Sequence, residues 1–198
     1  MHDDKPLVRL ASPRDRNSIR RDAYLLRVKL GLKKTLYFPI VEFLENVLPE
    51  IDPTFYIEVL EDSDLPGVQA EYVPSLNVIR VKSSVYEAAI SGYWWARSTL
   101  AHELGHYYFH DEKSVRYAKL DPGQKIPPDF DPERQANVFA AELLAPINLI
   151  DGLGVREVGK LCGVSYEIAK RQLRARDRIK SRREKKRAQK KKRSSSKA

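Results

Sequence analysis

The sequence predicts an α+β fold in which one small sheet packs on helices. Three short runs rich in β-branched residues lie between residues 55 and 82, and segments with helical apolar spacing flank them on both sides. At 198 residues with 42% hydrophobic content, the chain can bury one sizeable core plus a small appended unit. We therefore expect four parts: an arm at 1–17, a main domain at 18–150, a two-helix segment at 151–175, and a basic tail at 176–198.

Two helices are predicted before the sheet. Residues 1–17 are polar, contain two prolines and are expected to form a flexible arm. Ser18 is a suitable N-cap for a helix whose apolar residues share one face, and Gly31 is suited to end that helix. A second apolar stripe predicts a helix over residues 39–48 that Pro49 closes.

The predicted sheet has three strands, at residues 55–60, 68–73 and 76–82. A Pro-Ser pair separates the last two strands, and such a short break is typical of antiparallel neighbours. The sequence thus predicts a small three-stranded antiparallel sheet.

A long helix over residues 93–110 carries the motif His102-Glu103-Leu104-Gly105-His106. Helical residues four positions apart lie on one face, so the two histidines can direct their ring nitrogens to a single cation. Glu103 follows the first histidine directly and can accept a proton from a water held beside them. The motif, within apolar flanks, is typical of a buried zinc hydrolase helix.

Catalytic zinc takes three protein ligands and keeps one position open, so a further ligand is needed. His110 continues the series of histidines, but a straight helix cannot wrap three successive turns around one tetrahedral ion. After an expected loop at 111–131, a second helix begins at Asp131-Pro132 and places Glu133 in its first turn. A glutamate there either binds the ion or stabilises the helix dipole. Spacing alone leaves both roles open, and Glu142, further along, is expected to be structural.

Residues 101–110 and 133–146 together resemble the ImmA/IrrE family of metallo-endopeptidases, and the order of elements from about residue 35 to 175 agrees. The resemblance implies a zincin-like metallopeptidase core. It also implies that His102, His106 and Glu133 bind one Zn²⁺ per chain and that Glu103 is the general base. Asn137, one turn after Glu133, is expected to orient a ligand histidine.

Residues 151–175 are predicted to form a helix, a Gly-Val-Ser turn and a second helix, an arrangement that resembles a helix-turn-helix. In a DNA-binding protein, Tyr166, Lys170 and Arg171 would face bases or phosphates. The favoured alternative is an αα-hairpin packed on the main domain, because a complete third helix is missing.

The tail at 176–198 holds 13 Lys and Arg against two acidic residues, whereas the preceding residues hold 23 against 25, a net charge of −2. A segment of this composition cannot bury apolar area, and we expect a disordered or partly helical tail. It either stays solvated or binds DNA nonspecifically through phosphates.

The function expected from these features is zinc-dependent hydrolysis of a protein substrate. By resemblance, that substrate is a helix-turn-helix transcriptional repressor whose cleavage relieves repression, in a stress response or in mobile-element control. The alternative is a DNA-associated regulatory or toxin–antitoxin module whose zinc site is not proteolytic. One cysteine, no long apolar run and no signal-peptide pattern predict a cytoplasmic protein without a membrane segment. The sequence does not specify an oligomeric state.

Overall fold

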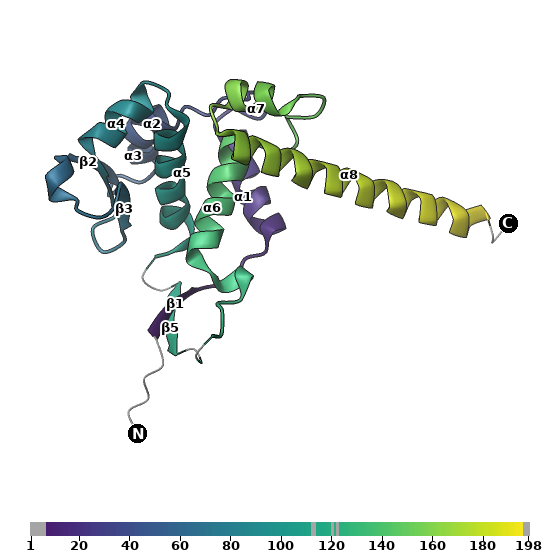
Figure 1. Ribbon diagram of the computed structural model, residues 1–198, viewed down its shortest axis with the longest axis horizontal. Helices are drawn as coiled ribbons and strands as arrows, with labels where there is room; N and C mark the ends of the chain where they lie inside the picture. The colour runs from purple at the N-terminus through teal and green to yellow at the C-terminus, as the bar shows by residue number, and fades with distance from the viewer. Residues whose placement is uncertain (1–6, 112–113, 120, 122, 196–198) are drawn as a thin grey trace.

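Helices α5 (Trp94–Phe109) and α6 (Pro132–Leu144) cross at the centre of the molecule, and the other elements lie around them (Figure 1). The computed structural model describes residues 7–111, 114–119, 121 and 123–195, with side chains as far as residue 189. A three-stranded sheet lies on the α5 side, while α1 (Arg16–Lys29) packs against α6. Among the described residues, no helix combines the length and apolar character needed to cross a bilayer.

The three-stranded sheet contains β2 (Tyr56–Leu60), β3 (Ala70–Val73) and β4 (Val78–Lys82) in the order β2-β4-β3. β3 and β4 form the predicted antiparallel hairpin. However, β2 pairs with β4 in parallel, so the prediction of an entirely antiparallel sheet is wrong. Residues 61–69 connect β2 to β3, which lies two strand positions away in the sheet. The chain then turns back, so that β4 lies between β2 and β3 and runs parallel to β2.

A second, two-stranded sheet pairs β1 (Leu7–Ala11) with β5 (Val115–Lys119) in antiparallel register. The arm expected at 1–17 is therefore ordered from residue 7 onward, and residues 1–6 lie outside the described part. The expected loop at 111–131 likewise contains a strand and the 3₁₀ turn η3 (Pro128–Phe130). Each strand is stabilised by a partner about a hundred residues away, so neither carries a strong local signal.

Helix α1 begins earlier than predicted because Asp15, rather than Ser18, is its N-cap. The Asp15 carboxylate accepts a hydrogen bond from the Ser18 backbone N–H at 2.7 Å. The helix predicted over 39–48 is interrupted: α2 (Ile40–Glu42) leads through a π-helical turn, η1 (Phe43–Val47), into α3 (Leu48–Ile51).

Pro49 lies inside α3 and does not end the helix, contrary to the prediction. The Leu48 N–H donates to the Phe43 carbonyl, five residues back, so Pro49 enters at the first turn of a new segment, where its missing N–H costs little. A further helix, α4 (Ser83–Ile90), follows the sheet and was not predicted.

The predicted start of α6 is confirmed. The Asp131 carboxylate caps the helix by accepting hydrogen bonds from the backbone N–H groups of Glu133 and Arg134. The centre of the α5–α6 crossing is Gly105, where an added Cβ would lie 2.8 Å from the Cα of Ala136. This close approach brings the first turn of α6 beside the two histidines of α5.

Replacing Gly105 by alanine should lower the free energy of unfolding by about 1–3 kcal/mol, because the two backbones must move apart. Urea denaturation of the two proteins measures the difference. Gly159→Ala is the matched control, since this helical glycine has only an ordinary contact, 3.4 Å to the Val164 carbonyl oxygen. The control should be neutral or slightly stabilising. A Gly105→Ala protein as stable as the wild type would contradict the close crossing.

The C-terminal part consists of α7 (Val155–Cys162), a short turn in which Gly163 is left-handed with φ 63°, and α8 (Tyr166–Ser195). Buried residues of both helices join the main core, namely Val158, Cys162, Ala169 and Leu173. The buried Arg97 of α5 donates to the carbonyls of Cys162 and Gly163, which fastens the turn to the core. The two helices thus pack as a hairpin on the main domain.

Beyond its docked first turns, α8 projects away from the rest of the molecule (Figure 1). Of the two states expected for the tail, the structure has the helical one as far as residue 195. Lys, Arg, Glu, Gln and Ala dominate the segment and are good helix formers. The docked turns supply the nucleus that an isolated basic peptide would lack.

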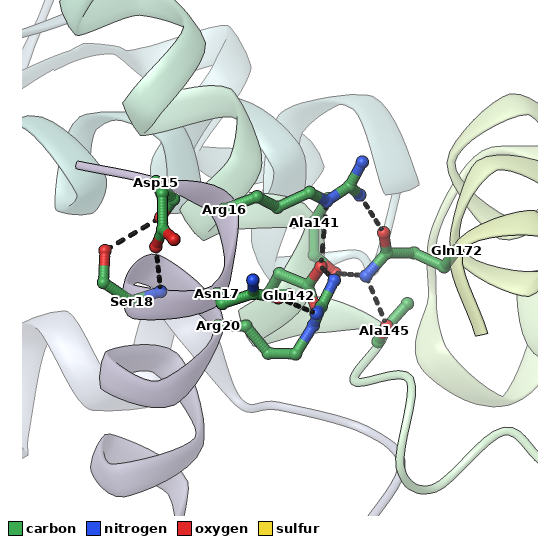
Figure 2. A network of polar contacts seen from close by, with 9 residues as sticks. All are labelled: Asp15, Arg16, Asn17, Ser18, Arg20, Ala141, Glu142, Ala145 and Gln172. Carbon is green, nitrogen blue, oxygen red and sulfur yellow. Dashed lines mark hydrogen bonds and ion pairs between the residues drawn. The ribbon is translucent and has the colours of Figure 1, made fainter. Parts of the chain in front are cut away.

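A network of polar contacts joins α1, α6 and α8 (Figure 2). The fully buried carboxylate of Glu142 accepts two hydrogen bonds from Arg20, at 2.8 and 3.0 Å, which confirms the expected structural role. Arg16 donates to Gln172 at 2.9 Å, and the Gln172 amide donates to two carbonyls at the end of α6. This network holds the start of α1 against the docked part of α8.

Candidate metal centre

Three side chains from two helices converge at the α5–α6 crossing. The His102 and His106 Nε2 atoms lie 3.0 Å apart. Glu133 places one carboxylate oxygen 3.2 Å from His102 Nε2 and the other 3.4 Å from His106 Nε2. The structure therefore brings together the three residues that the sequence singled out as ligands.

These separations fit a tetrahedral ion. Ligand atoms about 2.0–2.2 Å from a tetrahedral centre lie about 3.3–3.6 Å from one another, close to the values observed. The nitrogen and oxygen donors suit zinc, and three protein ligands leave one position open. Within the described part of the chain, this is the one group of three such side chains near enough to share an ion. The Glu133 side chain is exposed, so one side of the cluster is open to solvent.

The Glu133 carboxylate and the His102 ring stabilise each other's charged forms. Hydrogen bonds to His102 and His106 hold the pKa of the Glu133 carboxyl well below its usual range. Burial lowers the pKa of His102, but the hydrogen bond to Glu133 and the charge of Glu103 outweigh it, so its pKa is raised. A smaller contribution in the same direction comes from a hydrogen bond to Asn137. Asn137 also donates to the Glu133 carbonyl at 2.8 Å, so it lies between two of the three residues.

Glu103 is buried beside the two histidines, and its orientation is set by the sheet. One carboxylate oxygen, Oε2, accepts the backbone N–H of Tyr72 at 2.8 Å. Tyr72 belongs to β3, an edge strand, so this N–H points away from β4 and toward α5. Oε1 has no hydrogen-bond partner among the described residues. Burial raises the pKa of Glu103, against the lowering effect of His102 and His106.

Contacts of Asp52, which directly follows α3, with α5 and with the β3–β4 turn hold the edge strand in place. The Tyr107 hydroxyl and the Asn77 amide both donate to one oxygen of Asp52, each at 2.9 Å. The rings of Tyr72 and Tyr107 meet edge to face, with 5.7 Å between centroids. These contacts place the Tyr72 N–H where the Glu103 carboxylate can accept it.

Nothing in the sequence indicated that His110 and Gln135 would contact each other beside His106. His110, fully buried, lies with Nδ1 2.9 Å from His106 Nδ1 and with Nε2 3.0 Å from the side-chain oxygen of Gln135. The Gln135 amide nitrogen donates to the Ser12 and Asp129 carbonyls, at 2.9 and 2.8 Å. Because its N–H groups are used there, its oxygen must face His110 and accept the Nε2 proton.

This arrangement determines which nitrogen of His106 carries the proton. Burial lowers the pKa of His110 to about 4, so its ring is neutral near pH 7. With a proton on Nε2, the Nδ1 of His110 can only accept, and His106 must donate from its own Nδ1. The Nε2 of His106 is then left with a free lone pair directed toward His102 and Glu133. Gln135 and His110 thus prepare His106 as a metal ligand.

Replacing His110 by phenylalanine should weaken zinc binding by roughly 10–100-fold, because His106 loses the acceptor that sets its tautomer. Competition with a chromophoric chelator measures the affinity without requiring activity. Tyr108→Phe is the control, since it removes a polar group from a neighbouring position outside this chain of hydrogen bonds. Equal affinities for the His110→Phe variant and the control would rule out the positioning role.

The other predicted contact residues lie away from the centre. Tyr166 is exposed in the first turn of α8, and the Lys170 ammonium lies 5.6 Å from the centroid of its ring. Lys170 and Arg171 line a hollow between α8 and the start of α1. None of the three contributes to the cluster around Glu133.

The metal centre lies within the part of the chain that matches a known protein family. Residues 96–174 match the family Peptidase_M78, described as the IrrE N-terminal-like domain. A solved structure of a Mycobacterium tuberculosis transcriptional regulator is similar, with 14% sequence identity and a TM-score of 0.48. That similarity covers 77% of this chain and 45% of the regulator, so this chain spans less than half of the regulator's length. No curated protein matches the sequence. The matched residues include His102, Glu103, His106 and Glu133, and this match supports membership of the ImmA/IrrE family.

Proposed function

We propose that the protein is a zinc-dependent endopeptidase. His102, His106 and Glu133 would hold one Zn²⁺, and Glu103 would be the general base. The observation that carries this proposal is the meeting of three ligand side chains with a buried carboxylate that immediately follows the first of them. A structural zinc site is usually closed by four protein ligands, so a three-ligand site open to solvent favours catalysis.

Zinc bound at such a site polarises the scissile carbonyl and makes water a better nucleophile near neutral pH. Glu103 accepts the proton of the attacking water and returns it to the leaving amine. The Tyr72 N–H occupies Oε2, so the proton is taken up at Oε1. Because burial raises the pKa of Glu103, the protonated form needed for the second step is easier to reach. Asn137 and His110 keep His102 and His106 oriented.

The family resemblance supports a protein substrate, specifically a helix-turn-helix transcriptional repressor. The single cysteine agrees with a cytoplasmic location. Cleavage of the repressor would relieve repression. The test is incubation of the purified protein with the repressor encoded nearest to its gene, with fragments identified by mass spectrometry. We expect cleavage at a defined bond, loss of cleavage after zinc is removed by a chelator, and recovery when zinc is restored. Cleavage that survives complete removal of metal would refute the zinc-dependent mechanism.

The second candidate is a DNA-associated regulatory or toxin–antitoxin module in which the metal site is not proteolytic. The observation that favours it is the projecting basic helix α8, which the peptidase mechanism does not use. Docking of α7 and the first turns of α8 on the core supports the hairpin arrangement for residues 151–175. Stoichiometric zinc together with no cleavage of any neighbouring repressor would favour this second function.

A further inference from the structure

A cationic hollow lies where α8 leaves the core. It has a volume of about 310 Å³ and lies between α8 and the start of α1. Five of its lining residues are basic and one, Glu167, is acidic; the basic residues are Arg16, Lys170, Arg171, Arg174 and Arg178. We call this set the basic hollow.

Most of the positive charge of the basic hollow has no ion-pair partner among the described residues. Within the described part of the chain, none of its four α8 residues has an ion-pair partner. Arg16 is different, because Gln172 holds it at 2.9 Å and Glu142 lies 3.4 Å away (Figure 2). Glu142 already accepts two shorter bonds from Arg20, so one carboxylate faces two guanidinium groups. The network therefore holds Arg16 toward α8. Because Arg16 shares the Glu142 carboxylate with Arg20, one positive charge of the pair is left unbalanced.

Arg171 shows the effect of this crowding. Partial desolvation, and next the charge of Arg16, lower the pKa of the Arg171 guanidinium, while Glu142 raises it. An arginine remains protonated near neutral pH even so. Two neighbouring guanidinium groups repel each other, and an anion between them would relieve that repulsion.

Basic side chains continue from the hollow along the projecting helix. A second hollow of about 810 Å³ lies between α1 and α8, and most of its charged lining residues are basic. Its charged lining residues are Arg20, Arg21, Arg176, Lys180, Arg183 and Arg187, with Asp151 and Glu184. The cationic surface thus has contributions from α1 as well as from the tail, which composition alone does not reveal.

We propose that α8 and the start of α1 form a binding surface for the phosphate backbone of duplex DNA. Between residues 176 and 195 the only apolar side chains are Ile179 and Ala188. A helix that binds a membrane surface needs an apolar face, and a coiled-coil helix needs an apolar seam, so neither partner suits this segment. An α-helix with basic residues all round fits the DNA major groove, which admits a helix between two rows of phosphates.

The length of α8 is compatible with this partner. Its 30 residues make a helix about 45 Å long, of which the first turns are docked. The projecting part can therefore follow the major groove, while the basic hollow contacts a phosphate at the edge of that groove. Contacts of this kind set position and affinity without reading bases. The proposal does not depend on the peptidase, because the surface shares no residue with the metal centre.

The test measures binding of the full-length protein to a fluorescent DNA duplex by anisotropy, over a salt series from about 50 to 200 mM. We expect the triple variant Arg171→Gln, Arg174→Gln, Arg178→Gln to bind at least about tenfold more weakly at low salt. The slope of log affinity against log salt should also become shallower by about 2 to 3. Glutamine keeps the helix propensity, and circular dichroism verifies the helix.

The matched control removes three exposed lysines at the other end of α1, in the triple variant Lys29→Gln, Lys33→Gln, Lys34→Gln. It lowers the net charge equally and should leave the slope nearly unchanged. Arg16→Gln should reduce the slope by about 1, since one phosphate contact is lost. Equal losses in both triple variants would overturn the proposal. So would binding to phosphatidylserine vesicles with no binding to the duplex.

Discussion

Glu103→Gln should lower the rate of peptide-bond hydrolysis by about 10²–10⁴-fold while zinc stays bound. The glutamine amide has the size of the carboxylate, and its oxygen can still accept the Tyr72 N–H, but it cannot take a proton from water. The variant therefore removes the base and leaves the shape of the site. Fragment yield against time, with metal content measured on the same sample, separates the two effects.

Glu157→Gln is the matched control for this variant. Glu157 also accepts a backbone N–H, that of Gly154 at 2.7 Å, but it lies at the start of α7. Its replacement should leave the rate unchanged. A Glu103→Gln protein that cleaves at the wild-type rate would remove Glu103 from the mechanism, whatever the fate of the metal.

Glu133→Ala should lose its stoichiometric zinc. Two histidines from one helix remain, and the loss of a direct ligand should exceed the roughly 10–100-fold effect typical of an outer-shell partner. Metal analysis after dialysis against a weak chelator measures the result, and thermal unfolding verifies that the fold is retained. Because the Glu133 carboxylate is exposed, removing it leaves no buried charge unpaired.

The control for Glu133 addresses the alternative that the sequence leaves open. Glu167 also lies in the first turn of a helix, α8, where an acidic side chain favours the helix dipole. Glu167→Ala should therefore keep its zinc and lose only a little stability. If Glu133→Ala behaves in the same way, its role is that of a dipole partner and the ligand assignment is wrong.

Features with short-range causes were predicted well. The N-cap Asp131 followed by Pro132 marks the start of α6, and the four-residue spacing puts His102 and His106 on one face of α5. The β3–β4 hairpin likewise follows from a short break between two β-rich runs. In each case the deciding interaction joins residues only a few positions apart, so it can be read along the chain.

Features with long-range causes were missed or predicted wrongly. The β1 strand depends on β5, and the parallel pairing of β2 depends on a connection that skips one strand position. For the tail, the sequence left a disordered and a helical form open, and the helical form depends on the docking of the preceding turns of α8. Local composition describes each segment correctly as polar, β-rich or basic, but it does not name the partner that gives the segment its structure.

The sequence by itself determined the chemistry of the candidate site: two histidines on one helical face, a carboxylate between them, and a second helix that supplies Glu133. Only the tertiary structure decided that these groups meet, because the 3.2 Å between Glu133 and His102 requires the close crossing at Gly105. It also decided the proton position on His106, through Gln135. Residue spacing governs geometry within one helix, whereas packing between helices governs distances between residues far apart in the chain.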